Sequence, residues 1–222
     1  MADNSRSSVL RLVLVPSLIT LAVTIVRLAG ELQNWSPVLF RRSAGGGGAI
    51  VGIVWLVPVF GIYFALKLSG GAEGPSSAAK SIGFALLGLI VLVIGGAVGF
   101  SASVHFPGKY ALIYILMAAG AALVFPGWPE LWRALVAYAY AARIPVALVM
   151  FFAMRGRWGT HYDALPPQYA GLAGFWQQYL RMAVLPQLIL WVSFTIVVGA
   201  LFGTVVAAIA RAVRPADPDA SE

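Results

Sequence analysis

One arginine stands in the middle of a long apolar stretch. Arg143 lies about midway between Glu130 and Met154, surrounded by alanine, valine, isoleucine and tyrosine residues. If this stretch crosses a membrane, an ionised side chain at its centre costs at least about 2.5–3.5 kcal/mol. Such a cation has to face the interior of a helix bundle and find a partner there. We therefore expect Arg143 to form part of a binding site for an anionic or polar organic solute.

Two prolines mark the place of this site. Pro145 follows Arg143 by two residues, removes one helix hydrogen bond and leaves a backbone carbonyl without its donor. Pro58 stands at the matching place of an earlier apolar stretch. Interrupted helices in paired positions are the best sequence indication of a transporter binding site. The predicted site therefore combines Arg143, Pro145 and Pro58 with the aromatic residues of the same two stretches, namely Trp55, Tyr63, Tyr138 and Tyr140.

A purely structural role is the alternative for these residues. Arg143 would then pair with Glu31 or Glu130, or bind carbonyl groups released by proline. Aromatic side chains in membrane helices usually pack or anchor the chain at the interface. Pairing of Arg143 with a carboxylate would remove the main reason to expect a ligand.

A second group of polar residues falls in the loops. We expect these residues to contact anions or lipid headgroups at the interface: Arg41, Arg42, Arg155, Arg157 and His161. His161, Tyr162 and Asp163 are types that perform acid–base chemistry, but neither a serine nucleophile motif nor a paired intramembrane carboxylate accompanies them. We predict no catalytic residue here.

Metals and cofactors are not expected either. The chain has no cysteine and only two histidines, so thiolate sites and three-histidine metal sites are excluded. The run Gly45–Gly48 has neither the Lys-Ser/Thr of a phosphate-binding loop nor the spacing of a dinucleotide fingerprint.

The amino-acid composition indicates the class of protein in which these residues lie. Of the 222 residues, 60% are hydrophobic and only 10% charged, and the mean hydropathy is +0.87. Soluble domains carry about 25% charged residues. The net charge of +7 comes from cations scattered at the ends of apolar runs, which argues against nucleic-acid binding. We predict a polytopic integral membrane protein in contact with the lipid bilayer, located in a bacterial cytoplasmic membrane.

The predicted fold is an all-α bundle of about six transmembrane helices. The expected spans cover residues 9–32, 50–68, 81–104, 108–126, 130–154 and 186–211. Residues 175–185 mix aromatic and polar side chains and are expected to form a separate interfacial helix. Residues 1–214 would be one transmembrane domain, followed by a disordered acidic tail at 215–222.

The charge distribution leaves the orientation open. Six spans place both termini on one side of the membrane, and seven Lys and Arg residues fall on each side. The terminal side has Arg6, Arg11, Lys67, Lys80, Arg133, Arg211 and Arg214, and the opposite side has Arg27, Arg41, Arg42, Lys109, Arg155, Arg157 and Arg181.

An inverted repeat of two three-helix halves would produce such an even division. Three weak matches recur in the same order: a Trp-containing segment at 35 and at 128, Pro-Val at 58 and at 145, and Gly-xxx-Gly at 95 and at 199. Chance similarity between apolar helices rich in Gly, Ala, Val and Leu is the alternative. Gly-xxx-Gly spacing also allows close helix packing, within one chain, in a homo-oligomer or in a larger complex.

Three functions fit these patterns. The leading one is a small permease or carrier for an anionic or polar organic solute. The second is a non-catalytic structural or accessory subunit of a larger membrane complex. The third, an enzyme acting on lipid or isoprenoid substrates, is the weakest, because the metal-binding carboxylates that such chemistry usually uses are missing. We therefore expect no enzyme activity.

Overall fold

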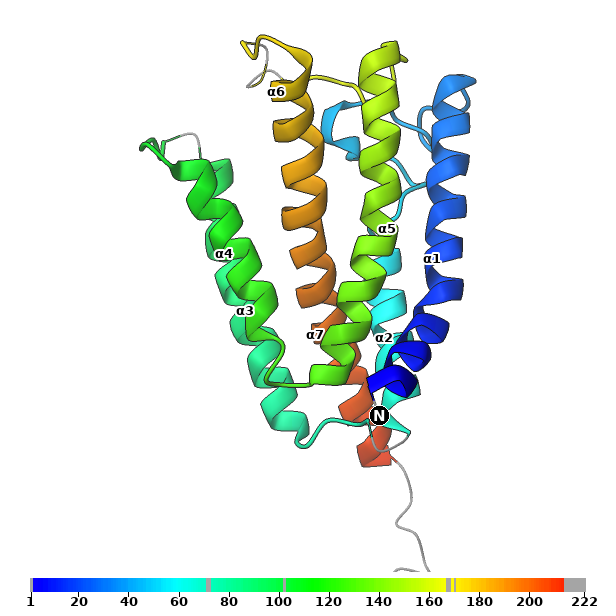
Figure 1. Cartoon of the computed structure of the whole chain (residues 1–222), viewed down its shortest axis with the longest axis vertical. Coiled ribbons are helices and arrows are strands. Elements are labelled where there is room, and N and C mark those ends of the chain that lie inside the picture. The colour runs from blue at the N-terminus through cyan, green and yellow to red at the C-terminus, as the bar shows by residue number, and fades with distance from the viewer. Residues whose placement is uncertain (1, 71–72, 102, 167–168, 170, 214–222) are drawn as a thin grey trace, which may run out of the picture.

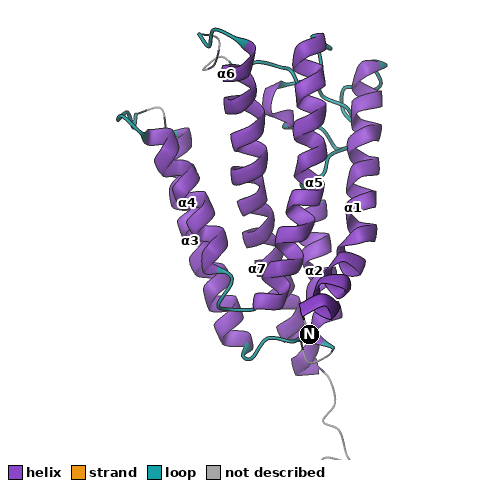
Figure 2. Ribbon diagram, viewed as in Figure 1, coloured by secondary structure: helices purple, strands orange, loops and turns teal. Residues whose placement is uncertain are grey.

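The computed structural model describes residues 2–70, 73–101, 103–166, 169 and 171–213, and the predicted tail at 215–222 lies outside this part. Every regular element in the described part is helical (Figure 2). The elements are α1 (Ala2–Leu32), η1 (Ala44–Gly46), α2 (Leu56–Ser69), α3 (Ala78–Phe100), α4 (Lys109–Leu123), α5 (Pro129–Gly156), α6 (Phe175–Tyr179), η3 (Leu180–Val184), η4 (Pro186–Trp191) and α7 (Val192–Val213).

Four helical segments are long and apolar enough to cross a membrane. They comprise Val9–Leu32, Ala78–Gly99, Pro129–Gly156 and Phe175–Val213, with 24, 22, 28 and 39 residues. A bilayer core of about 30 Å needs about 20 helical residues. This result indicates an integral membrane protein and agrees with the predicted all-helical bundle.

The predicted six full spans are not confirmed, because α2 and α4 are short. α2 has 14 residues and α4 has 15, which corresponds to about 21–23 Å of helix. The prediction of a span over 50–68 was wrong at its beginning. Residues 50–55 are not helical, and α2 begins at Leu56. Pro58 therefore lies in the first turn, where a missing N–H breaks no helix hydrogen bond.

The last part of the chain that the structure describes is one long helix rather than an interfacial helix and a separate span. α6, η3, η4 and α7 follow one another without a break from Phe175 to Val213 (Figure 1). Residues 180–184 and 186–191 have π-helical hydrogen bonding, and Pro186 begins the second of these stretches. The wider π-turns accommodate the proline that would otherwise interrupt the helix.

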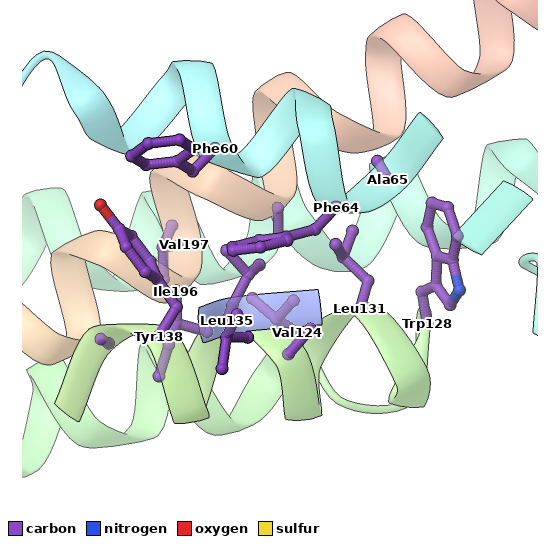
Figure 3. Close-up of a cluster of buried hydrophobic side chains, with 14 of the residues drawn as sticks. Phe60, Phe64, Ala65, Val124, Trp128, Leu131, Leu135, Tyr138, Ile196 and Val197 are labelled. Carbon is purple, nitrogen blue, oxygen red and sulfur yellow. The ribbon is translucent and has the colours of Figure 1, made fainter. Parts of the chain in front are cut away.

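The main core fills one half of the bundle. Phe60 and Phe64 of α2 pack edge-on against Tyr138 of α5, with ring centroids 5.3 and 5.5 Å apart. Leu135 of α5 and Val197 of α7 complete this layer and are fully buried (Figure 3). α2 therefore occupies the centre of this half. Residues 33–55, which connect α1 to the beginning of α2, are mostly irregular.

Glycines bring two helix pairs into close contact. A Cβ atom on Gly61 of α2 would collide with the backbone of Gly199 in α7, and a Cβ on Gly203 would lie 2.6 Å from the Gly61 oxygen. A Cβ on Gly88 of α3 would lie 2.6 Å from the Gly120 oxygen of α4. These contacts account for part of the predicted glycine packing, within one chain.

The helix packing gives no support to the inverted repeat. A two-fold relation would equate α1 with α4, α2 with α5, and α3 with the last helix. α2 packs along α7 and α1 along α5, but among the described residues the equivalent pairs, α5 with α3 and α4 with α2, do not pack along each other.

Candidate ligand-binding site

A cavity of about 800 Å³ occupies the half of the bundle that α2 does not fill. Its walls come from α1, the 45–55 segment, α3, α4, α5, residues 161–166 and 169, and the π-helical part of the last helix. The charged, polar and large side chains of the lining include Arg27, Trp55, Tyr110, Tyr114, Met117, Arg143, His161, Tyr162, Gln187 and Trp191. This volume lies within the range of ligand-binding pockets.

Arg143 lies at the wall of this cavity with incomplete partners. Its side chain belongs to α5 and the residue is 4% exposed. The guanidinium carbon lies 4.8 Å from the ring centroid of Trp191, in a cation–π contact, and Nη1 donates a long hydrogen bond of 3.4 Å to Gln187 Oε1. The Nε atom is buried and has no hydrogen-bond partner in the described part of the chain. The guanidinium therefore has hydrogen-bonding capacity that the described residues do not use.

The carboxylates that could have neutralised Arg143 bind elsewhere. Glu31 pairs with Arg27 and His161, and Glu130 pairs with Arg133 at 3.2 Å. Among the described residues, no salt bridge reaches Arg143. The structural alternative of a closed ion pair with Glu31 or Glu130 therefore does not hold.

The π-helical stretch positions the two side chains that contact Arg143. Gln187 follows Pro186 directly, and its Nε2 atom also lies 3.6 Å from Met150 Sδ. Trp191 lies four residues further along the same helix. π-turns are frequently found at functional sites because they rotate side chains out of the regular helical register. Neither residue was predicted, although an amide next to a proline in an apolar helix was a usable signal.

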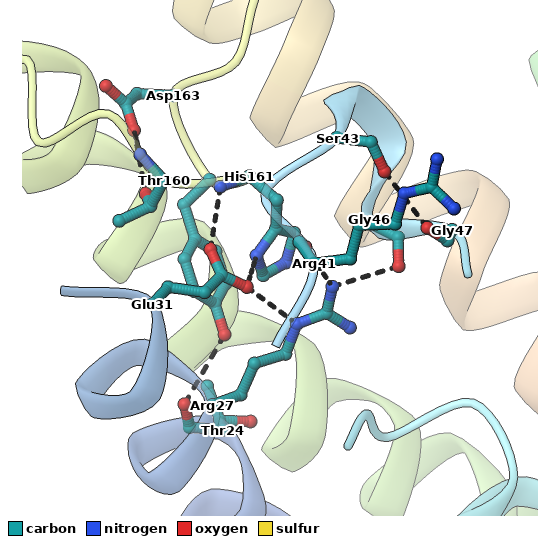
Figure 4. A network of polar contacts seen from close by, with 11 residues as sticks. Thr24, Arg27, Glu31, Arg41, Ser43, Gly46, Gly47, Thr160, His161 and Asp163 are labelled. Carbon is teal, nitrogen blue, oxygen red and sulfur yellow. Dashed lines mark hydrogen bonds and ion pairs between the residues drawn. The ribbon is translucent and has the colours of Figure 1, made fainter. Parts of the chain in front are cut away.

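A cluster of polar side chains lies beside the cavity, which Arg27 and His161 help to line (Figure 4). The Glu31 carboxylate is fully buried and accepts three hydrogen bonds: from Arg27 Nε at 3.0 Å, from the His161 backbone N–H at 2.8 Å, and with His161 Nδ1 at 2.5 Å. Arg27 Nη2 in turn donates to the Gly46 carbonyl at 2.9 Å. This Arg27–Glu31–His161 cluster ties the end of α1 to the 157–174 loop and to the glycine run.

The glycine run is required by this cluster. Gly46 and Gly48 have φ angles of 69° and 80°, which favour glycine. A Cβ on Gly46 would lie 2.8 Å from the Cδ2 atom of His161 and 3.2 Å from Arg27 Nη2. Gly45–Gly48 is therefore a tight loop packed against the cluster.

The charge of the cluster follows from burial. Burial lowers the pKa of His161 below its ordinary value, and this effect exceeds the opposing effect of the Glu31 carboxylate. A neutral imidazole then donates its Nδ1 proton to Glu31. Burial also raises the pKa of Tyr162, while both Arg27 and Arg143 act in the opposite direction. The Tyr162 hydroxyl therefore stays protonated and lies within the field of both guanidinium groups.

The structure brings only part of the predicted site together. Arg143 and Trp55 line the cavity, whereas Pro58, Tyr63, Tyr138, Tyr140 and Pro145 are not among its lining residues. Tyr138 is 1% exposed and belongs to the core, where its hydroxyl lies 2.9 Å from Thr20 Oγ1. The prediction of two helices broken at mid-membrane was wrong, because Pro58 lies in a first turn and α5 continues through Pro145.

The predicted interfacial group separates in the same way. His161 lines the cavity, but Arg41, Arg42, Arg155 and Arg157 do not, and all four arginines are exposed. Arg155 instead lies over the ring of Phe175, 5.2 Å from its centroid. Asp163 is held within its own loop, accepting hydrogen bonds from the Gly159 and Thr160 backbone and from the Thr160 hydroxyl.

No protein-family model, curated protein or solved structure matches this chain. The function therefore has to be argued from the cavity and its side chains.

Proposed function

We propose that this protein is a small membrane permease or carrier for an anionic organic solute, which binds in the cavity against Arg143. The observation that carries the proposal is a buried guanidinium that lines a ligand-sized cavity and has no carboxylate partner among the described residues. A buried cation without an anion is costly, so a site of this kind favours binding of an anion.

The surroundings of Arg143 support an organic solute. Trp191 and Gln187, both in the last helix, contact the guanidinium by a cation–π interaction and a long hydrogen bond. The Nε atom has no hydrogen-bond partner among the described residues. Aromatic and aliphatic side chains supply most of the remaining wall, which suits an apolar body. We place the carrier in a bacterial cytoplasmic membrane. The exposed arginines of the loops would attract anions toward the cavity.

Uptake into proteoliposomes tests this proposal. The purified protein would be screened with a panel of radiolabelled carboxylates, sulfonates and phosphate esters. We expect uptake of at least one anion class, and we expect Arg143→Ala to reduce it to the level of protein-free liposomes. Arg133→Ala is the matched control, since Arg133 lies on the same helix but is exposed and paired with Glu130. Full uptake by folded Arg143→Ala would refute the site.

The accessory-subunit alternative makes a different prediction for the same preparation. An accessory subunit would transport none of these anions and would purify from its native membrane in a fixed ratio with other chains. That combined outcome would replace the carrier by a structural role.

A further inference from the structure

The cavity is too large for a simple inorganic anion. Its volume of about 800 Å³ approaches the upper part of the range seen for drug-sized ligands. A ligand that contacts Arg143 alone would leave most of the wall uncovered. α4 contributes Tyr110, Tyr114 and Met117 to the wall. The ligand therefore needs an apolar or aromatic body as well as an anionic group.

The charges around the cavity balance to a single positive charge. Arg27 and Arg143 are the charged side chains among the lining residues that the structure describes. Arg27 is compensated by Glu31, with 3.0 Å between Nε and Oε1. His161 shares the same carboxylate, and at neutral pH its imidazole is uncharged, because burial lowers its pKa. Arg143 is then the one uncompensated charge of the described cavity.

We infer that the cavity selects an amphipathic organic anion with one negative charge, such as a sulfonate, carboxylate or phosphodiester on an aromatic or aliphatic body. This inference rests on the proposed function and narrows its substrate class. The anionic group pairs with Arg143, and the body packs against the aromatic wall. A neutral analogue leaves Arg143 without an anion, and a dianion brings a second charge that no described cation compensates; both are unfavourable away from water.

A series of naphthalene compounds tests the charge rule, because the apolar body stays constant. The protein in nanodiscs of zwitterionic lipid would be titrated calorimetrically with 1-naphthalenemethanol, 1-naphthalenesulfonate and 1,5-naphthalenedisulfonate at neutral pH, with empty nanodiscs as the blank. We expect the monosulfonate to bind at least about tenfold more tightly than either of the others. Methanesulfonate, with the same charge and no aromatic body, should bind at least about tenfold more weakly than the monosulfonate.

Two variants separate this inference from the proposed function. Arg143→Gln should weaken monosulfonate binding by at least about tenfold, while Arg133→Gln should leave it unchanged. If the disulfonate binds as tightly as the monosulfonate and both depend on Arg143, the single-charge inference is wrong and the carrier site remains. If the neutral alcohol binds as tightly as the monosulfonate, or if Arg143→Gln has no effect on binding, both the single-charge inference and the proposed anion site are wrong. Absence of monosulfonate binding in the wild type refutes the inferred substrate class, whereas the uptake screen then decides on the carrier.

Discussion

At the scale of single residues, the Arg143 guanidinium is contacted by two side chains from a distant part of the chain. A cation in an apolar stretch is visible in any sequence, because its cost in a membrane depends on composition alone. Gln187 lies 44 positions away in the chain, and the cation–π partner Trp191 lies further still. Pairing over such separations depends on how α5 and the last helix are packed. The same holds for Glu31, which bonds His161 across 130 positions.

The neutral state of His161 gives a testable pH dependence. Its pKa in the folded protein lies below the value of about 6.5 in an unfolded chain. As the pH falls below about 6.5, His161 takes up a proton in the unfolded state before it does so in the folded state. Acid therefore favours unfolding. We expect the thermal unfolding temperature of the wild type in detergent to fall between about pH 7.5 and 5.5, and to fall less in His161→Gln.

The difference between the two pH profiles can be assigned to His161, although the chain has two histidines. His105 is present in both proteins, so the difference between their pH profiles reports on His161. A wild type that becomes more stable than His161→Gln on acidification would mean that Glu31 holds a charged imidazolium. The charge balance of the cavity would then be wrong as well.

At the scale of elements, the apolar stretches predicted where the helices lie. The prolines did not predict where the helices are interrupted. The predicted stretch at 50–68 contains a real helix, but its first residues form an irregular wall of the cavity. Non-helical backbone at membrane depth is tolerated where it is buried in protein or lines a cavity. The sequence signal for the break was the glycine-rich run before residue 50 and not Pro58. In the last helix, π-turns accommodate Pro186 without a break. Local helix propensity cannot predict such turns.

Gly61 tests whether the close packing of α2 and α7 supports the fold. We expect Gly61→Ala to lower the free energy of unfolding by about 1–3 kcal/mol, because the new methyl group meets backbone atoms of Gly199, which cannot move aside without separating the helices. Gly83→Ala is the matched control, since nothing lies within 4 Å of a Cβ at that position of α3. Thermal unfolding of both variants checks this. Equal stability of the two variants would contradict the proposed packing.

At the scale of the whole molecule, the long helices run in two opposite directions, and the short helices α2 and α4 lie between them in the chain. α1, α3 and α5 run in the same direction, and the last helix runs in the opposite one (Figure 1). The chain must return between them. It does so through residues 33–69 and through α4 with its flanking turns. The order of the apolar stretches was therefore predictable from the sequence, whereas the short lengths of α2 and α4 were not predicted.

Single cysteines test this topology in a chain that has none of its own. We expect Ser43→Cys and Ser103→Cys to be labelled by a membrane-impermeant maleimide from one side, and Ser77→Cys and the N-terminal end from the other. Each variant would be labelled in sealed right-side-out and inside-out vesicles. Labelling of residues 43 and 77 from the same side would show that α2 and its preceding loop do not cross the membrane.

The position of a bound anion shows whether Arg143 forms the binding site. A crystal of the protein with 6-bromo-2-naphthalenesulfonate would be measured at the bromine absorption edge. We predict a bromine peak inside the cavity, near Met117, with the sulfonate within hydrogen-bonding distance of the Arg143 guanidinium. An empty cavity in crystals that hold the compound elsewhere, or a sulfonate bound away from Arg143, would contradict the account.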